Sequence, residues 1–164
     1  MNNYSDEEFL YIISGILNND EFMKLSTIRH HGITRLDHSL RVAYYSYKVC
    51  KLLGLDYIQV TEAALLHDFF TDEVQDKNMV IRLIKHPTIA LNNSLKYYRL
   101  SPMQKDIIKT HMFPVTIIPP KYLESWIVDL IDDISAVYER VVCTKKSIST
   151  AVSFIFVLII NIFK

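Results

Sequence analysis

The sequence predicts an all-α fold, organised as a single-domain helical bundle. Apolar residues recur every three or four positions through most of the chain, and no segment shows the alternating pattern of a β-strand. The 164 residues include only three glycines and five prolines, which is few for a fold rich in loops or sheets. We expect residues 1–164 to form one domain, because this length fits one core and no linker composition interrupts it.

Helical periodicity and capping signals divide the chain into expected helices, which cover residues 5–17, 21–25, 35–53, 57–68, 80–84, 87–98, 101–111 and 121–142. Polar, glycine-containing or proline-containing segments between them predict loops at residues 18–20, 28–34, 70–77 and 114–120.

Capping boxes are expected at the start of two of these helices. Ser5 and Glu8 have the required spacing, and so do Ser101 and Gln104, where Pro102 takes the first helical position. In such a box each side chain accepts a hydrogen bond from an amide that the helix leaves free.

Other boundaries are predicted from single residues. Gly54 is expected just past the end of helix 35–53, and Asp56 is expected to cap the helix that follows. Pro87 is expected to begin a new helix. In the last helix, apolar spacing predicts that these side chains face inward: Ile127, Leu130, Ile131, Ile134 and Tyr138.

The composition limits the classes of partner. Half of the residues are apolar, and the 18 basic residues balance the 18 acidic ones, which argues against a nucleic acid polymer as the ligand. Cys50 and Cys143 form no Cys-x-x-Cys pair, so we expect a reducing compartment. No basic and apolar leader opens the chain, which predicts a cytoplasmic protein.

The C-terminal segment, residues 147–164, is strongly apolar. Its core, Ala151 to Phe163, is shorter than the roughly 20 residues that span a bilayer as a helix. We expect a final helix packed on the domain, with a peripheral membrane contact or a partner-binding helix as alternatives. For the oligomeric state, which the sequence leaves open, a homodimer is one alternative.

The most informative residues are histidines and aspartates spread along the chain. The adjacent pair His67 and Asp68 ends an apolar helical run, where both side chains are costly to bury without a partner. Further candidates for the same site come from other predicted helices or their ends: His38, His86, His111, Asp129, Asp132 and Asp133. Each alone is compatible with a satisfied core histidine or a solvated helix face, but the ordered set is harder to explain in that way.

A metal centre accounts for these residue types. Neutral imidazole and carboxylate ligands suit iron or manganese, and also zinc, cobalt, nickel or magnesium, whereas the lack of thiolates disfavours a structural zinc site. Four histidines and two aspartates exceed the needs of one ion and suffice for two divalent transition-metal ions that share a carboxylate. Helix bundles build such centres in their interior.

The order of these residues resembles a known family. His38, the His67-Asp68 doublet and Asp132 resemble the His…His-Asp…Asp signature of the HD superfamily of metal-dependent phosphohydrolases. The resemblance covers about residues 30–140 and implies an all-helical fold in which these four residues bind metal. Helical periodicity alone does not choose between Asp132 and Asp133; the resemblance favours Asp132, because the family's last aspartate commonly precedes a small residue.

Two further histidines extend the resemblance. His86 and His111 fall where the dinuclear subfamilies place additional ligands, in an order similar to that of bacterial diadenosine tetraphosphate symmetrical hydrolases and, more distantly, of HD-GYP phosphodiesterases. This implies that Asp68 bridges two ions, with His38, His67 and Asp132 on one and His86 and His111 on the other.

The chain also departs from the family pattern. Phe69 and Phe70 follow the doublet where many relatives carry a phosphate-contacting Gly-Lys, and no Gly-Tyr-Pro motif supports a cyclic dinucleotide substrate. Contacts to phosphate must therefore come from other residues. The candidates are Arg35, with Arg41 weaker, for phosphate oxygens, and His30 or His31 for a general acid; surface ion pairs or exposed loop histidines are the alternatives.

These observations predict a phosphohydrolase that acts on a nucleotide or another small phosphorylated metabolite, with Asp68, His31 and Arg35 in catalytic roles. A di-iron oxygenase is an alternative, because the HD fold also carries such enzymes. A degenerate HD domain that only binds a nucleotide or a partner protein is a second alternative, although such a domain has no need of six ligands.

Overall fold

The computed structural model describes residues 4–30, 33–71 and 78–143, and within them it confirms the all-α class. Seven α-helices are present in these ranges, together with one 3-10 helix and one pair of two-residue strands. Their bounds, in chain order, are α1 (Glu7–Leu17), α2 (Asp20–Met23), η1 (Lys24–Thr27), β1 (Arg29–His30), β2 (Ile33–Thr34), α3 (Arg35–Leu52), α4 (Tyr57–Leu66), α5 (Met79–Tyr97), α6 (Pro102–Thr110) and α7 (Leu123–Cys143).

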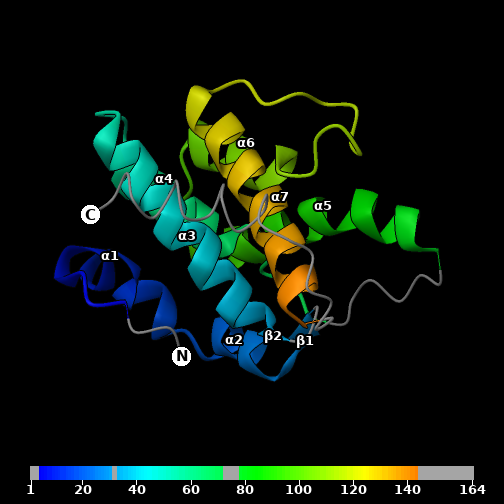
Figure 1. Ribbon diagram of the computed structural model, residues 1–164, viewed down its shortest axis with the longest axis horizontal. Coiled ribbons are helices and arrows are strands. Elements are labelled where there is room, and N and C mark those ends of the chain that lie inside the picture. Colours follow the sequence, from blue (N-terminus) through cyan, green and yellow to red (C-terminus); the bar gives the residue numbers. More distant parts are fainter. Residues whose placement is uncertain (1–3, 31–32, 72–77, 144–164) are drawn as a thin grey trace.

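Helix α3 lies at the centre of the bundle and packs against α4 and α7 (Figure 1). Helix α6 contacts α4, α5 and α7, and α1 packs on α4. Three histidines are among the largest side chains that are fully buried, beside apolar residues such as Phe9 and Tyr47: His38, His67 and His111. Buried histidines therefore lie among the apolar side chains of the core.

Local signals predicted several helix boundaries correctly. Ser101 and Gln104 form the expected capping box at the start of α6. The Asp56 carboxylate accepts a hydrogen bond from the amide of Gln59 and caps α4. Gly54 follows the end of α3 with a φ of 69°, which is the left-handed conformation expected at that position.

The predicted cap of α1 was wrong. Asp6, not Ser5, is the N-cap, and its carboxylate accepts a hydrogen bond from the amide of Phe9. Glu8 does not close a capping box, because its carboxylate accepts hydrogen bonds from the hydroxyls of Tyr47 and Tyr57 on neighbouring helices. Tertiary partners outcompeted the local pattern.

Two other boundaries also differ from the prediction. Helix α5 is continuous, and Pro87 lies inside it instead of starting a second helix. Residues 28–34, expected to be a loop throughout, include the antiparallel pair of β1 and β2, in which Arg29 faces Thr34 and His30 faces Ile33. Strands of two residues are too short to give an alternating sequence pattern.

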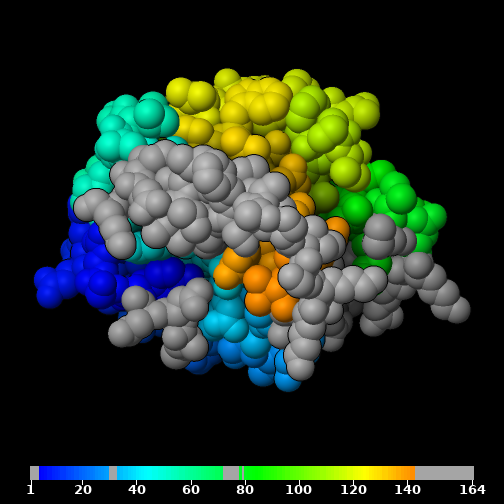
Figure 2. Space-filling view, in the orientation of Figure 1, coloured from blue at the N-terminus to red at the C-terminus, as the bar shows by residue number. Residues whose placement is uncertain are grey.

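Helix α7 turns a different face inward from the one that apolar spacing predicted. Leu130 is 59% exposed, and only Ile131 of the five expected residues is buried. One side of α7 reaches the molecular surface in Figure 2. The buried face carries mostly polar residues: Ser125, Val128, Asp129, Ile131, Asp132, Ser135 and Glu139. Apolar spacing misreads this helix because its inner face belongs to a polar site.

None of the helices in the described part of the chain combines the length and hydrophobicity needed to cross a membrane. The expected C-terminal helix over residues 147–164 and most of the expected loop over residues 70–77 lie outside the described residues.

Gly54 and Gly15 provide a matched pair of substitutions with opposite expected signs. A Cβ added at either position meets no atom within 4 Å, so conformational preference alone decides the outcome. We expect Gly54→Ala to lower the free energy of unfolding by about 1 kcal/mol, because an alanine is strained at positive φ. Gly15→Ala, inside α1, should raise it by about 0.5–1 kcal/mol. Urea unfolding measures both, and a shift of the same sign in both variants would contradict the assignment.

Candidate metal centre

Five helices bring the six predicted metal ligands together. His38 is the fourth residue of α3, His86 lies within α5, and Asp132 lies on α7. His67 and His111 are the residues that end α4 and α6, and Asp68 follows His67 directly. All six residues are buried, with none more than 7% exposed.

Three overlapping groups of these residues have ligand atoms close enough to share an ion. The groups are His38 with His67 and Asp68, His67 with His111 and Asp132, and Asp68 with His86 and His111. Within each group the atoms lie within 4.8 Å of one another. Clustered His and Asp side chains of this kind fit a divalent metal site.

Two of the histidines are oriented by the helices that they terminate. His67 Nδ1 donates to the carbonyl of Ala64 at 2.7 Å, and His111 Nδ1 donates to the carbonyl of Ile108 at 2.9 Å. The last carbonyls of a helix have no partner within the helix, so a side chain that turns back can use them. Ending a helix at a histidine thus fixes the ring and directs Nε2 away from the helix.

The other two histidines are held by different acceptors. His86, the residue directly before Pro87, donates from Nδ1 to the carbonyl of Arg82 at 3.1 Å. His38 Nδ1 lies 3.0 and 3.1 Å from the two carboxylate oxygens of Glu139, a residue 101 positions away on α7. In all four rings Nδ1 faces an acceptor, so Nε2 is the atom left for a metal.

The Nε2 atoms converge on the two aspartates. His38 Nε2 and His67 Nε2 lie 2.8 and 3.6 Å from Asp132 Oδ1. His86 Nε2 and His111 Nε2 lie 3.4 and 3.8 Å from Asp68 Oδ1. The site therefore has two halves, with His38 and His67 beside Asp132 in one and His86 and His111 beside Asp68 in the other. Asp68 is also close enough to His38 and His67 to form a group with them.

Several of these buried atoms are poorly satisfied by the protein alone. His86 Nε2 and His111 Nε2 lie 2.9 Å apart, so two lone pairs face each other when both rings carry their proton on Nδ1. Among the described residues, His67 Nε2 and Asp68 Oδ1 have no hydrogen-bond partner. Buried polar atoms without partners are costly, and bound cations would satisfy them. The residues present thus fit a metal.

The electrostatics differ between the two halves. Burial opposes ionisation of Asp68 and Asp132, but the neighbouring histidines hold the pKa of both carboxyls well below the usual range. Burial opposes charge on His38 too, yet Asp132 and Glu139 raise its pKa to about 10. Burial, reinforced by the other imidazoles, lowers the pKa of His111 to about 3. The His38 ring therefore lies between two carboxylates, whereas the rings of His86 and His111 face each other.

Helix α7 distinguishes between its three candidate aspartates. Asp132 is buried and faces His38, whereas Asp133 is exposed. Asp129 is also buried, but its carboxylate accepts a hydrogen bond from the amide of Phe113 at 3.2 Å and belongs to none of the three groups. Burial and the nearby carboxylates of Asp133 and Asp132 raise the pKa of Asp129 to about 7.

Arg35, predicted to contact phosphate, is buried beside the centre. Its guanidinium lies 3.7 Å from the centre of the Phe70 ring, and Nη1 donates to the carbonyl of Phe70 at 2.6 Å. Its Nε lies 3.8 Å from Asp68 Oδ2. The Arg35 charge is thus held against Asp68, which belongs to two of the three groups.

The remaining predicted substrate contacts are placed differently. Arg41 forms an ion pair with Glu139 and lies 5.3 Å from the centre of the Tyr138 ring. His30 belongs to β1 but its side chain is not described, and His31 lies outside the described residues.

Glu139 is the main residue of the site that the sequence analysis missed. It follows Asp132 by seven positions, and this spacing places both on one face of a helix. A buried carboxylate at that spacing, with Arg41 three positions after His38 on the facing helix, was a signal available in the sequence.

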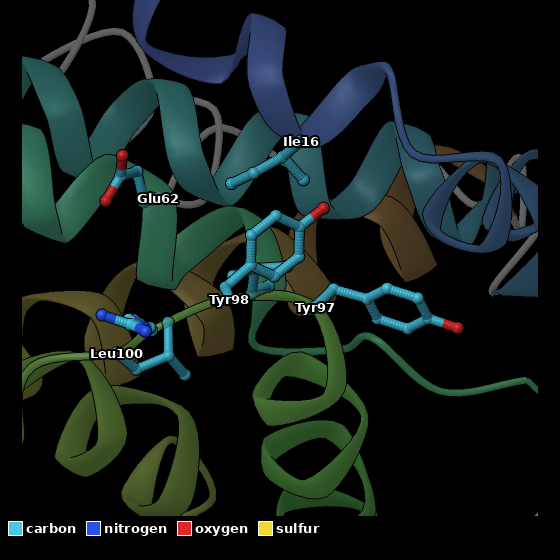
Figure 3. Close-up of a pocket in the computed structure, with 7 residues that line it drawn as sticks. Ile16, Glu62, Tyr97, Tyr98 and Leu100 are labelled. Carbon is cyan, nitrogen blue, oxygen red and sulfur yellow. The ribbon is translucent and has the colours of Figure 1, made fainter.

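A separate pocket of about 240 Å³ lies between α1, α4 and the segment that follows α5 (Figure 3). Ile16, Glu62, Tyr97, Tyr98 and Leu100 are among its lining residues. The lining includes none of the six clustered ligands, so this pocket is distinct from the candidate metal centre.

Comparisons with known proteins gave one match. The family model described as HD domain matches residues 35–137, a segment that contains all six clustered residues. No curated protein and no solved structure matches the chain.

Metal loading should stabilise the fold. We expect Mn²⁺ to raise the Tm of metal-free protein, because an ion that binds only the folded state adds about 2.7 kcal/mol at about 100 times its Kd. A chelator should reverse the shift. Differential scanning fluorimetry measures both. Asp68→Asn removes a charged ligand from both halves, so its Tm should respond much less; an equal rise in that variant would place the ions elsewhere.

Asp129 should make stability depend on pH. Its pKa rises from 3.8 to about 7 in the folded protein, so its favourable contribution is present below about pH 4 and lost as the pH rises through 7. Asp129→Asn keeps an acceptor for the Phe113 amide and removes this loss. We expect the variant to gain stability over the wild type between pH 5 and pH 8. Urea unfolding in chelator at pH 5 and pH 8 measures the difference in free energy of unfolding between variant and wild type. The same difference at both pH values would refute the prediction.

Proposed function

Because the chain belongs to the HD domain family, we propose that it is a metal-dependent phosphohydrolase. The substrate would be a nucleotide or another small phosphorylated metabolite, cleaved at a phosphoester or phosphoanhydride. The observation that carries this proposal is the convergence of four imidazole nitrogens on two buried carboxylates, each ring fixed by its own Nδ1 acceptor.

The proposed centre holds two divalent ions, with iron or manganese favoured. Asp68 would be shared, because it belongs to one group with His38 and His67 and to another with His86 and His111. Asp132 would complete the first half, since its carboxylate lies nearest to His38. Six ligand side chains leave positions for water and substrate on two ions, which suits hydrolysis.

When bound, such ions supply Lewis acidity, which activates water and neutralises charge on phosphoryl oxygens. The protein sets the charge balance. Asp68 and Asp132 supply two negative charges, whereas two divalent ions would carry four positive charges. The histidine ligands are neutral when they bind metal. The site therefore keeps an excess of positive charge, which favours an anionic phosphoryl group.

Arg35 would add to this excess. Its guanidinium is fixed by the Phe70 carbonyl and ring, and it faces the Asp68 oxygen Oδ2. We propose that it orients Asp68 and contributes positive potential where charge develops on the phosphoryl group. A preorganised charge of this kind costs no reorganisation during the reaction.

A panel of phosphomonoesters, phosphodiesters and nucleotides, including a dinucleoside polyphosphate, tests the proposal. Wild-type protein with added Mn²⁺ or Fe²⁺ should release phosphate or nucleotide from a member of the panel. We expect Asp68→Ala to abolish both metal loading and turnover, because both halves of the centre lose a ligand. Metal content is measured on the same preparations by mass spectrometry.

Two neighbouring residues on α7 provide a matched comparison. Asp132→Asn removes a buried carboxylate of the cluster, whereas Asp133→Asn removes the same charge from an exposed position. We expect loss of metal and activity in the first variant and near wild-type values in the second. Retained turnover in Asp68→Ala would refute the site. Oxygen uptake by iron-loaded protein without phosphate release would favour an oxygenase, and absence of bound metal would favour a binding-only domain.

A further inference from the structure

One of the four histidines differs from the others in the partner of its Nδ1 atom. His67, His86 and His111 donate to backbone carbonyls of their own helices. His38 instead faces both oxygens of the Glu139 carboxylate, at 3.0 and 3.1 Å. A carboxylate acceptor is charged, whereas a carbonyl is neutral, so the two kinds of partner affect the imidazole differently.

Glu139 is unusually well enclosed for a carboxylate. It is 1% exposed, and its other close partner is Arg41, which forms an ion pair with it from α3. Arg41 itself has a side chain that is only 12% exposed. Burying a carboxylate costs stability because the charge loses its hydration, and ion pairs in the interior often do not repay this cost. The position therefore indicates a function for this charge.

A carboxylate that accepts from Nδ1 makes Nε2 of the same ring a stronger donor to a metal. This effect acts only on the half that contains His38. The same half contains the terminal carboxylate Asp132, 2.8 Å from His38 Nε2. The other half has two histidines with neutral acceptors, and its only carboxylate, Asp68, lies beside the positive charge of Arg35.

We propose that Glu139 is a positioning residue that makes the His38 half of the centre the tighter metal position. The ion beside His38 then binds first, and the ion beside His86 and His111 binds second and exchanges more readily. This inference rests on the proposed two-metal centre, and it adds an order of loading and the residue that sets it.

A purely structural role for Glu139 makes a different prediction. If the ion pair with Arg41 only joins α3 to α7, then its loss should lower the stability of the fold and leave the two metal affinities in their original ratio. Glu139→Gln separates the roles, because the amide oxygen can still accept from His38 Nδ1 while the negative charge is lost.

Titration of the metal-free full chain with Mn²⁺, followed by calorimetry and by the electron paramagnetic resonance of free Mn²⁺, measures the two steps. Wild-type protein should bind two ions in resolved steps. In Glu139→Gln the tighter step should weaken by about 10- to 100-fold, while the weaker step changes by less than about threefold. Glu62→Gln is the matched control, since Glu62 is a half-buried, hydrogen-bonded carboxylate away from the centre.

A second variant controls for the effect of leaving Arg41 without its carboxylate partner in Glu139→Gln. Arg41→Gln with Glu139→Gln removes both charges of the ion pair, and it should show the same selective loss at the tighter step while its thermal unfolding stays cooperative. Equal weakening of both steps, or no change, in these variants would overturn the role of Glu139 and leave the proposed hydrolase intact. Binding of one ion or none by the wild type would instead overturn the two-metal centre and the loading order together.

Discussion

The arrangement of the whole site depends on where the Nδ1 atoms of four buried histidines are held. A buried imidazole is tolerated when its N–H has an acceptor, and each of these rings has one. The same bonds turn every Nε2 atom toward Asp68 or Asp132. Satisfying one side of each ring thus gathers the Nε2 atoms on the other side, where His67 Nε2 and Asp68 Oδ1 have no hydrogen-bond partner among the described residues and bound cations would relieve this cost.

Helix ends and one helix face supply most of these acceptors. Two helices end at a metal-ligand candidate, so the free carbonyls of their last turns hold the rings of His67 and His111. Helix α7 contributes residues from its inner face, which carries a stripe of buried polar residues where ordinary bundle helices carry apolar ones. This explains why Leu130 is exposed. The helix is oriented by what Asp132 and Glu139 contact, and its apolar residues take the positions that remain.

Features that depend on interactions within one helical turn were predicted correctly, whereas several features that depend on contacts between helices were not. The caps at Ser101 and Asp56 and the glycine after α3 depend on residues within one turn, and they were predicted correctly. The cap at Ser5 failed because Glu8 finds partners on two other helices. The six clustered residues were found from their order in the chain, but periodicity could not separate Asp132 from its neighbour. That choice depends on the rotation of α7, which is a tertiary property.

Helix α3 shows how the charges of the site are organised. Arg35 and Arg41 lie three positions before and after His38, so all three share one face of the helix. Arg35 holds its charge against Asp68, and Arg41 pairs with Glu139. Each arginine therefore restrains a carboxylate that touches the centre or one of its rings. Because the protein fixes these anions, packing sets the ligand geometry without a cation, and we expect metal binding to require little rearrangement of the bundle.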